Sequence, residues 1–121
     1  MTSVLVVDDA LFMRATLKKL LTEAGFQVVG EAENGELAVA RYQELHPDVV
    51  MMDITMPTMD GLSALKEIMK VDPKAAVIMC TALGQESSVM SALDSGAKDY
   101  IIKPFKSDKV VAAVKKAAGK D

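Results

Sequence analysis

The 121-residue sequence contains one cysteine, no tryptophan, and only five aromatic residues in total. A lone cysteine excludes an intrachain disulfide, and the position of Cys80 inside an apolar run predicts a reduced, buried and inert thiol. With so few aromatic rings, aliphatic and methionine side chains must fill the interior. The nine methionines are therefore interpreted as packing residues and not as metal ligands.

Features of membrane and nucleic-acid-binding proteins are also missing. No apolar run approaches the ~20 residues of a bilayer-spanning helix, and no charged region followed by an apolar signal segment precedes the first strand pattern. The net charge of −3 argues against sequence-independent binding of nucleic acid, which requires lysine and arginine to neutralise phosphates. We expect a soluble, cytoplasmic, single-domain protein over 1–121, without a linker or low-complexity tract.

Short apolar runs alternate with amphipathic helical patterns along the whole chain. The helical patterns lie between and after the runs; Gly25 and Gly96 are expected to end two of them, Asn34-Gly35 to form a turn and Ser107 to cap the last. The only histidine, His46, precedes Pro47 at a predicted helix end and is interpreted as a solvated terminus. The predicted strands are 3–7, 27–32, 48–53, 76–81 and 98–102.

Five strands and five helices in strict alternation predict an α/β fold, a doubly wound five-stranded parallel sheet with helices on both faces. The strand patterns are nearly continuous apolar runs, which suits strands buried on both sides. The carboxyl ends of such strands open into one crevice. The polar residues at these ends are Asp8, Asp9, Asp53, Thr81 and Lys103.

Together these side chains are suited to hold a divalent cation and a phosphoryl group. Mg²⁺ prefers oxygen ligands and takes one or two carboxylates plus phosphate oxygens, while a lysine supplies a point charge for phosphate. Each residue alone has an ordinary explanation: a helix cap for an aspartate, a surface position for Lys103, and a strand end for Thr81. The combination at several strand ends favours a functional site.

Several motifs resemble the receiver domain of two-component response regulators, in order and over the whole chain. The resemblance extends more narrowly, through 9–14 and 53–57, to the single-domain chemotaxis regulators of that family. It implies a flavodoxin-like strand order of 2-1-3-4-5. The motifs are Val6-Val7-Asp8-Asp9, Asp53-Ile54-Thr55-Met56-Pro57 with Asp60-Gly61, Thr81-Ala82, Gly96-Ala97-Lys98-Asp99-Tyr100 and Lys103-Pro104-Phe105.

The resemblance also implies a role for each matching residue. Asp53 would be the phosphoacceptor, with Thr81 and Lys103 contacting the phosphoryl oxygens. Mg²⁺ would be held by Asp53, by Asp9 directly, by Asp8 through water and by the backbone carbonyl of Thr55. Tyr100 would act with Thr81 as a switch, Pro104 would follow a cis peptide, and Gly61 would have a structural role.

The implied function is that of a stand-alone response regulator. A CheA-like histidine kinase would donate a phosphoryl group to Asp53 in a Mg²⁺-dependent reaction, and hydrolysis of the acyl-phosphate would reset the switch. The expected protein is a monomeric signalling switch and not an enzyme in the usual sense. Its output is expected through a surface within 87–118, toward a protein target such as the flagellar motor switch, with a phosphatase as a further partner.

Three alternatives remain open at this stage. A phosphorelay intermediate would have the same site and would pass its phosphoryl group to another histidine protein. A flavodoxin-like electron carrier would need a phosphate-binding loop after the first strand, where Asp8 and Asp9 would repel phosphate. A small-molecule aspartyl-phosphate hydrolase usually carries a second aspartate two residues after the nucleophile, where this sequence has Thr55.

Overall fold

A computed structural model describes residues 1–119, so the last two residues of the predicted 1–121 domain lie outside the described part. Strands and helices alternate as predicted. The strands are β1 (Ser3–Val7), β2 (Gln27–Ala32), β3 (Val49–Asp53), β4 (Val77–Thr81) and β5 (Asp99–Ile102). The helices are α1 (Leu11–Glu23), α2 (Gly35–Leu45), α3 (Gly61–Val71), α4 (Glu86–Asp94) and α5 (Ser107–Ala117).

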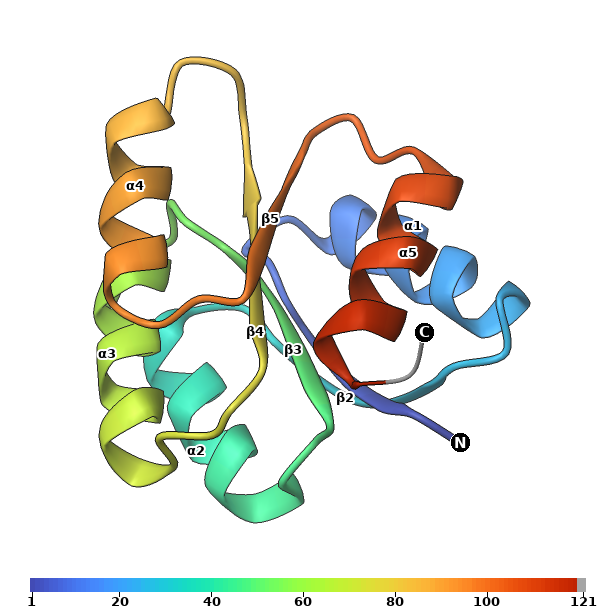
Figure 1. The fold of residues 1–121 in the computed structure, drawn as a ribbon, viewed down its shortest axis with the longest axis horizontal. Coiled ribbons are helices and arrows are strands. Elements are labelled where there is room, and N and C mark those ends of the chain that lie inside the picture. The colour runs from blue at the N-terminus through green and yellow to red at the C-terminus, as the bar shows by residue number, and fades with distance from the viewer. Residues whose placement is uncertain (120–121) are drawn as a thin grey trace.

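The five strands form one parallel sheet in the order β2-β1-β3-β4-β5, which confirms the predicted doubly wound topology. Helices α2, α3 and α4 cover one face of the sheet, and α1 and α5 cover the other (Figure 1). The chain reverses its direction of winding between β1 and β3, and the crevice of such a sheet lies at the carboxyl ends of these strands.

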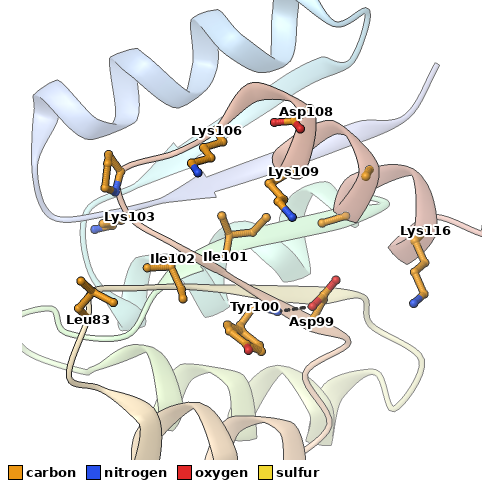
Figure 2. Close-up of a pocket in the computed structure, with 13 residues that line it drawn as sticks. Leu83, Asp99, Tyr100, Ile101, Ile102, Lys103, Lys106, Asp108, Lys109 and Lys116 are labelled. Atoms are coloured by element: carbon orange, nitrogen blue, oxygen red, sulfur yellow. Dashed lines mark hydrogen bonds between the residues drawn. The ribbon is translucent and has the colours of Figure 1, made fainter.

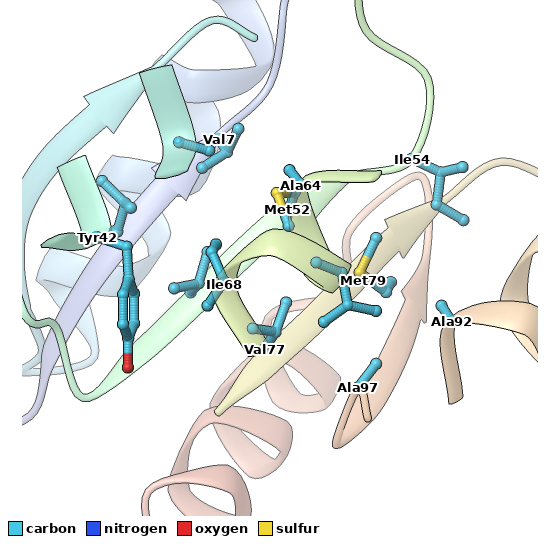
Figure 3. Packing of buried hydrophobic residues seen from close by; sticks show 14 of the residues in the cluster. Val7, Tyr42, Met52, Ile54, Ala64, Ile68, Val77, Met79, Ala92 and Ala97 are labelled. Carbon is cyan, nitrogen blue, oxygen red and sulfur yellow. The ribbon is translucent and has the colours of Figure 1, made fainter. Parts of the chain in front are cut away.

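Two separate hydrophobic clusters form the core, one on each face of the sheet. Alternate residues of a strand point to opposite faces, so Val50 and Met52 of β3 pack on the α2–α4 side while Met51 packs on the α1–α5 side. Figure 3 shows the first cluster, in which Met52 and Met79 lie with Ile68 of α3. The predicted role of methionine in the core is therefore confirmed for Met51, Met52 and Met79, which are fully buried.

The central strands are buried on both faces, whereas the edge strand β5 is not. Tyr100 is 42% exposed and Ile102 is 46% exposed, so the apolar run of β5 forms part of the surface. The prediction of strands covered on both sides therefore holds for β3 and β4, whose residues are all buried.

Two local predictions were wrong. Asn34-Gly35 is not a separate turn, because Asn34 is the N-cap of α2 and its side-chain oxygen accepts the Leu37 N–H at 2.9 Å. Ser107 does not cap α5, because it is the first helical residue and Lys106 precedes it with extended backbone and no side-chain cap bond. The expected helix ends are confirmed at Gly25 and Gly96, which have φ of 92° and 113°.

Among residues 1–119, no helix combines the length and the apolar character that crossing a membrane requires.

Candidate phosphoryl and metal site

Three carboxylates converge at the carboxyl edge of the sheet. Asp53 is the last residue of β3, and Asp8 and Asp9 follow β1 directly. One carboxylate oxygen from each of the three lies within 4.8 Å of the others. Asp8 and Asp53 are 3% and 7% exposed, whereas Asp9 is exposed. The structure thus brings together the acidic residues that were expected to share a crevice.

Local hydrogen bonds hold Asp8 in this position. Its backbone N–H continues the β-ladder by donating to the Ala32 carbonyl at 3.1 Å, and its Oδ1 accepts the Ala10 N–H at 2.9 Å. The side chain of Asp8 therefore turns back over the start of α1, and its second oxygen is available to the site.

Lys103 supplies the positive charge of the cluster. Its Nζ donates to Asp8 Oδ2 at 2.9 Å and lies 3.2 Å from Asp53 Oδ1. The Lys103 N–H donates to the Thr81 carbonyl at 2.7 Å, which fixes the backbone beside β4. The peptide bond from Lys103 to Pro104 is cis, as predicted.

Burial is the main cause of the shifted pKa of Asp53. It raises the pKa of the Asp53 carboxyl, the nearby charges of Asp8 and Asp9 raise it further, and Lys103 opposes the shift. Burial acts to lower the pKa of Lys103, but the hydrogen bond to Asp8 and the two carboxylate charges outweigh it, so the pKa is raised. Lys103 therefore remains an ammonium group at neutral pH.

The donor set fits a hard divalent cation. Three carboxylates face a single ammonium group, so the ionised cluster carries excess negative charge that a cation would neutralise. All three offer oxygen ligands, which Mg²⁺ prefers. Thr55, the expected carbonyl ligand, lies two residues beyond Asp53 and is itself exposed, in the loop between β3 and α3.

Gly61 lies where that loop passes closest to β3. A Cβ at this position would collide with the carbonyl oxygen of Asp53 and would lie 2.9 Å from the Cα of Ile54. The Gly61 N–H donates to the Ile54 carbonyl at 2.7 Å, and Asp60 caps α3 by accepting the Ser63 N–H at 2.8 Å. The absence of a side chain at Gly61 lets α3 begin directly against the backbone of Asp53.

Thr81 lies at the expected strand end, and its hydroxyl already has partners. The residue is 2% exposed, and Thr81 Oγ1 lies 2.9 Å from Gln85 Oε1 and 3.1 Å from the Ala82 carbonyl oxygen. Gln85 is a site residue that the sequence pattern did not predict, because it precedes a helix and does not lie at the end of a strand.

Arg14 ends the 9–14 motif, but the sequence predicted no role for it in the site. Its guanidinium donates from Nη1 to the Asp8 carbonyl at 2.8 Å and from Nε to Glu31 Oε1 at 3.1 Å. Lys18 Nζ also contacts Glu31, at 2.8 Å. These contacts tie the backbone after β1 to the edge strand β2. The pKa of Glu31 is lowered, chiefly because Lys18 donates to its carboxylate.

Tyr100 and Ile102 line a groove of about 840 Å³ between β5 and α5. Figure 2 shows this groove, with Lys106 and Lys109 projecting from the α5 side and Leu83 near its end. The surface lies within the 87–118 region from which output was expected, apart from Leu83. It combines an apolar floor with a lysine-rich rim.

Two other reactive side chains take no part in the cluster. Burial raises the pKa of the Cys80 thiol to about 12, so the predicted inert thiol is confirmed. His46 is exposed at the C-cap of α2, before the amino end of β3. It is the solvated helix terminus that was predicted, and it lies at the edge of the sheet opposite the carboxylates.

Comparison with known proteins agrees with this geometry. The family model described as "Response regulator receiver domain" matches residues 4–115. The Thermotoga maritima chemotaxis protein CheY is 56% identical, with 95% of this chain and 96% of that protein covered. Bacillus subtilis CheY is also 56% identical, with 93% and 94% covered. CheY in the CheX-CheY-BeF3-Mg complex from Borrelia burgdorferi has a TM-score of 0.90 and 42% identity, with 95% and 87% covered.

Proposed function

This chain belongs to the response regulator receiver domain family and resembles CheY chemotaxis regulators, and from this premise we propose that Asp53 accepts a phosphoryl group from a histidine kinase. Mg²⁺ is the proposed cofactor. The phosphorylated protein then changes its affinity for a protein target in chemotaxis, so that the chain acts as a switch with its own phosphorylation and dephosphorylation chemistry.

One observation carries the proposal: Lys103 contacts both Asp8 and Asp53 within a cluster of three carboxylates. Asp53 is held at the end of a buried strand with its side chain directed at this ammonium group. The arrangement suits a nucleophile that must approach an anionic phosphoryl donor.

In the proposed reaction, an Asp53 carboxylate oxygen forms a bond to phosphorus while the bond from phosphorus to the donor imidazole nitrogen breaks. The leaving imidazole takes up a proton. Such transfers pass through loose transition states, so positioning and charge neutralisation supply most of the catalysis. In this reaction Lys103 would pair with one phosphoryl oxygen and the Thr81 hydroxyl would donate to another; the contact of Lys103 with Asp53 supports the first role.

A bound Mg²⁺ would add charge neutralisation between the carboxylate and the phosphoryl group. Asp8, Asp9 and Asp53, with the Thr55 carbonyl, are the residues we assign to hold it.

The proposed partners follow from the family and from the surface. A CheA-like histidine kinase is the proposed phosphodonor, and the flagellar motor switch is the proposed target, reached through the groove beside Tyr100. The Borrelia CheY neighbour was solved with CheX, and we assign a protein of that kind as a further partner, with phosphatase activity. We further propose that the protein is a cytoplasmic monomer.

The alternatives differ in how well they are supported. Membership of the receiver family favours a signalling switch over a flavodoxin-like electron carrier. Small-molecule phosphohydrolases usually carry an aspartate two residues after the nucleophile. This chain has Thr55 there, which favours a signalling switch over a phosphohydrolase. A phosphorelay intermediate would share the site, and phosphotransfer from the modified protein to candidate histidine proteins would distinguish it.

Intact mass after incubation with Mg²⁺ and acetyl phosphate tests the proposal. The wild type should gain one phosphoryl group, and chelation of the metal should prevent the gain. Asp53→Asn should gain none, whereas Asp94→Asn, which changes an exposed aspartate of α4, should behave as the wild type. A folded wild type that stays unmodified with Mg²⁺ present would refute the function.

A further inference from the structure

The side-chain amide of Gln85 joins the two loops that border the site. Gln85 precedes α4, and its Oε1 accepts the Ala82 N–H at 2.8 Å and lies 2.9 Å from Thr81 Oγ1. Its Nε2 donates to Thr55 Oγ1 at 2.9 Å. Because a backbone N–H can only donate, the Ala82 contact defines which end of the amide carries the oxygen. One amide therefore links the loop after β3 to the loop after β4.

The two groups that donate to Gln85 lie beside the proposed phosphoacceptor. In the β3–β4 ladder Asp53 pairs with Cys80, so Thr81 and Ala82 come directly after the residue opposite Asp53. A hydroxyl has a single proton to donate. If the Thr81 hydroxyl donates to Gln85, it cannot at the same time donate to a phosphoryl oxygen on Asp53.

We propose that Gln85 is a latch: its carbonyl oxygen occupies, in the unphosphorylated protein, the place that a phosphoryl oxygen takes at Thr81 and Ala82 after modification of Asp53. This inference rests on the proposed function. Phosphorylation displaces the amide from both donors and thereby releases its link to Thr55. Gln85 is a positioning residue, since it acts on the donors and does not touch the reacting carboxylate.

The latch has a thermodynamic consequence. Interactions present only in the unmodified state favour that state, and their loss shifts the balance toward the phosphoryl-bound state. Removing the Gln85 amide should therefore strengthen binding of a phosphoryl mimic by about 3- to 10-fold, the effect expected for one or two partly exposed hydrogen bonds.

Isothermal titration calorimetry with fluoroberyllate in excess Mg²⁺ measures the dissociation constant of the phosphoryl mimic. Gln85→Ala and Gln85→Leu should both bind more tightly than the wild type, and their thermal midpoints without ligand should fall by a few degrees, because the lost hydrogen bonds also stabilise the unliganded fold. Gln85→Leu keeps most of the side-chain bulk and so separates lost hydrogen bonds from easier access. Gln43→Ala, the same change at an exposed position of α2, is the matched control and should leave the dissociation constant unchanged.

A spectroscopic measurement adds a readout that a purely structural role would not move. In wild-type protein the side-chain amide resonance of Gln85 should shift on saturation with fluoroberyllate, because the bond to Thr55 Oγ1 is lost. In Thr55→Val the Gln85 amide has lost the same hydrogen bond, so without fluoroberyllate its resonance should already lie near the position seen in the fluoroberyllate-saturated wild type.

The outcomes separate the latch from the function on which it rests. A wild type that binds no fluoroberyllate overturns both. Wild-type binding that Gln85→Ala and Gln85→Leu leave unchanged overturns the latch alone, and so does tighter binding in Gln85→Ala without a matching gain in Gln85→Leu.

Discussion

The Lys103 ammonium lies 2.9 Å from Asp8 Oδ2, although 95 residues separate the two in the sequence. Their strands, β5 and β1, are not neighbours, because β3 and β4 lie between them in the sheet. The lysine side chain therefore reaches across the carboxyl edge of the sheet and contacts Asp53 of β3 as well. This one side chain connects the ends of three strands.

Loss of this ammonium group should destabilise the protein when no divalent metal is present. Lys103→Met would leave Asp8 and Asp53 as buried carboxylates without their cation, at an expected cost of about 2 kcal/mol in the free energy of unfolding. Urea denaturation with a chelator measures the cost, and added Mg²⁺ should recover part of it. Lys98→Met, at an exposed lysine, is the control; an equal cost for both variants would contradict the role of the cluster.

Magnesium should stabilise the fold through the exposed carboxylate of Asp9. A ligand at ten times its dissociation constant adds about 1.4 kcal/mol to the free energy of unfolding. Asp9→Asn should slightly raise the metal-free stability, because it removes a negative charge that repels the Asp53 carboxylate, but it should need about tenfold more Mg²⁺ for the same gain. Thermal unfolding at graded Mg²⁺ concentrations measures both quantities, and equal Mg²⁺ responses in the two proteins would remove Asp9 from the metal site.

The two glycine positions Gly61 and Gly84 should respond differently to alanine. At Gly61 the added Cβ meets the Asp53 carbonyl, so Gly61→Ala should cost about 3 kcal/mol and should also slow phosphorylation of Asp53. At Gly84 the space is open but φ is +92°, so Gly84→Ala should cost only about 1 kcal/mol through backbone strain. Urea denaturation of both variants measures the two losses in the free energy of unfolding, and acetyl phosphate labelling measures the rate of phosphorylation. A larger loss of stability in Gly84→Ala than in Gly61→Ala would contradict the prediction.

The stability contributed by Glu31 should depend on pH. Its pKa is lowered in the folded protein, so its contribution is present above the ordinary glutamate pKa and is lost as pH falls through the folded value. Glu31→Gln should therefore lower the free energy of unfolding by a few tenths to about 1 kcal/mol at pH 7 and by much less at pH 3. Denaturation at both pH values checks this, and a deficit of the same size at pH 3 would show that the effect is not ionic.

Much of the site could be predicted because it lies at strand ends. The bounds of β1 agree with the predicted 3–7, since a continuous apolar run marks them. The bounds of β2 also agree with the predicted 27–32, although its pattern is weaker and is interrupted by Gly30. Once the strands are parallel, their carboxyl ends share an edge, and Asp8, Asp53 and Lys103 are brought together there.

The residues that sequence analysis missed come from helices or helix starts. Arg14 reaches Asp8 from the first turn of α1, and Gln85 reaches Thr55 and Thr81 from the start of α4. Neither position carries a periodic signal, because these contacts depend on where each helix packs against the sheet. The expected cap at Ser107 was wrong for a related reason: capping requires extended backbone, and here Lys106 has it.

The sequence by itself determined the alternation of strands and helices, the buried character of the middle strands and the residues at their carboxyl ends. Short apolar runs and helical periodicity are local properties of the chain, and they lead to this architecture wherever packing permits it. Only the tertiary structure decided that Lys103 contacts both Asp8 and Asp53, and that the Gln85 side-chain oxygen lies within hydrogen-bond distance of the Thr81 hydroxyl. Contacts of this kind are decided by the packing of helices and loops against the sheet, which no local pattern encodes.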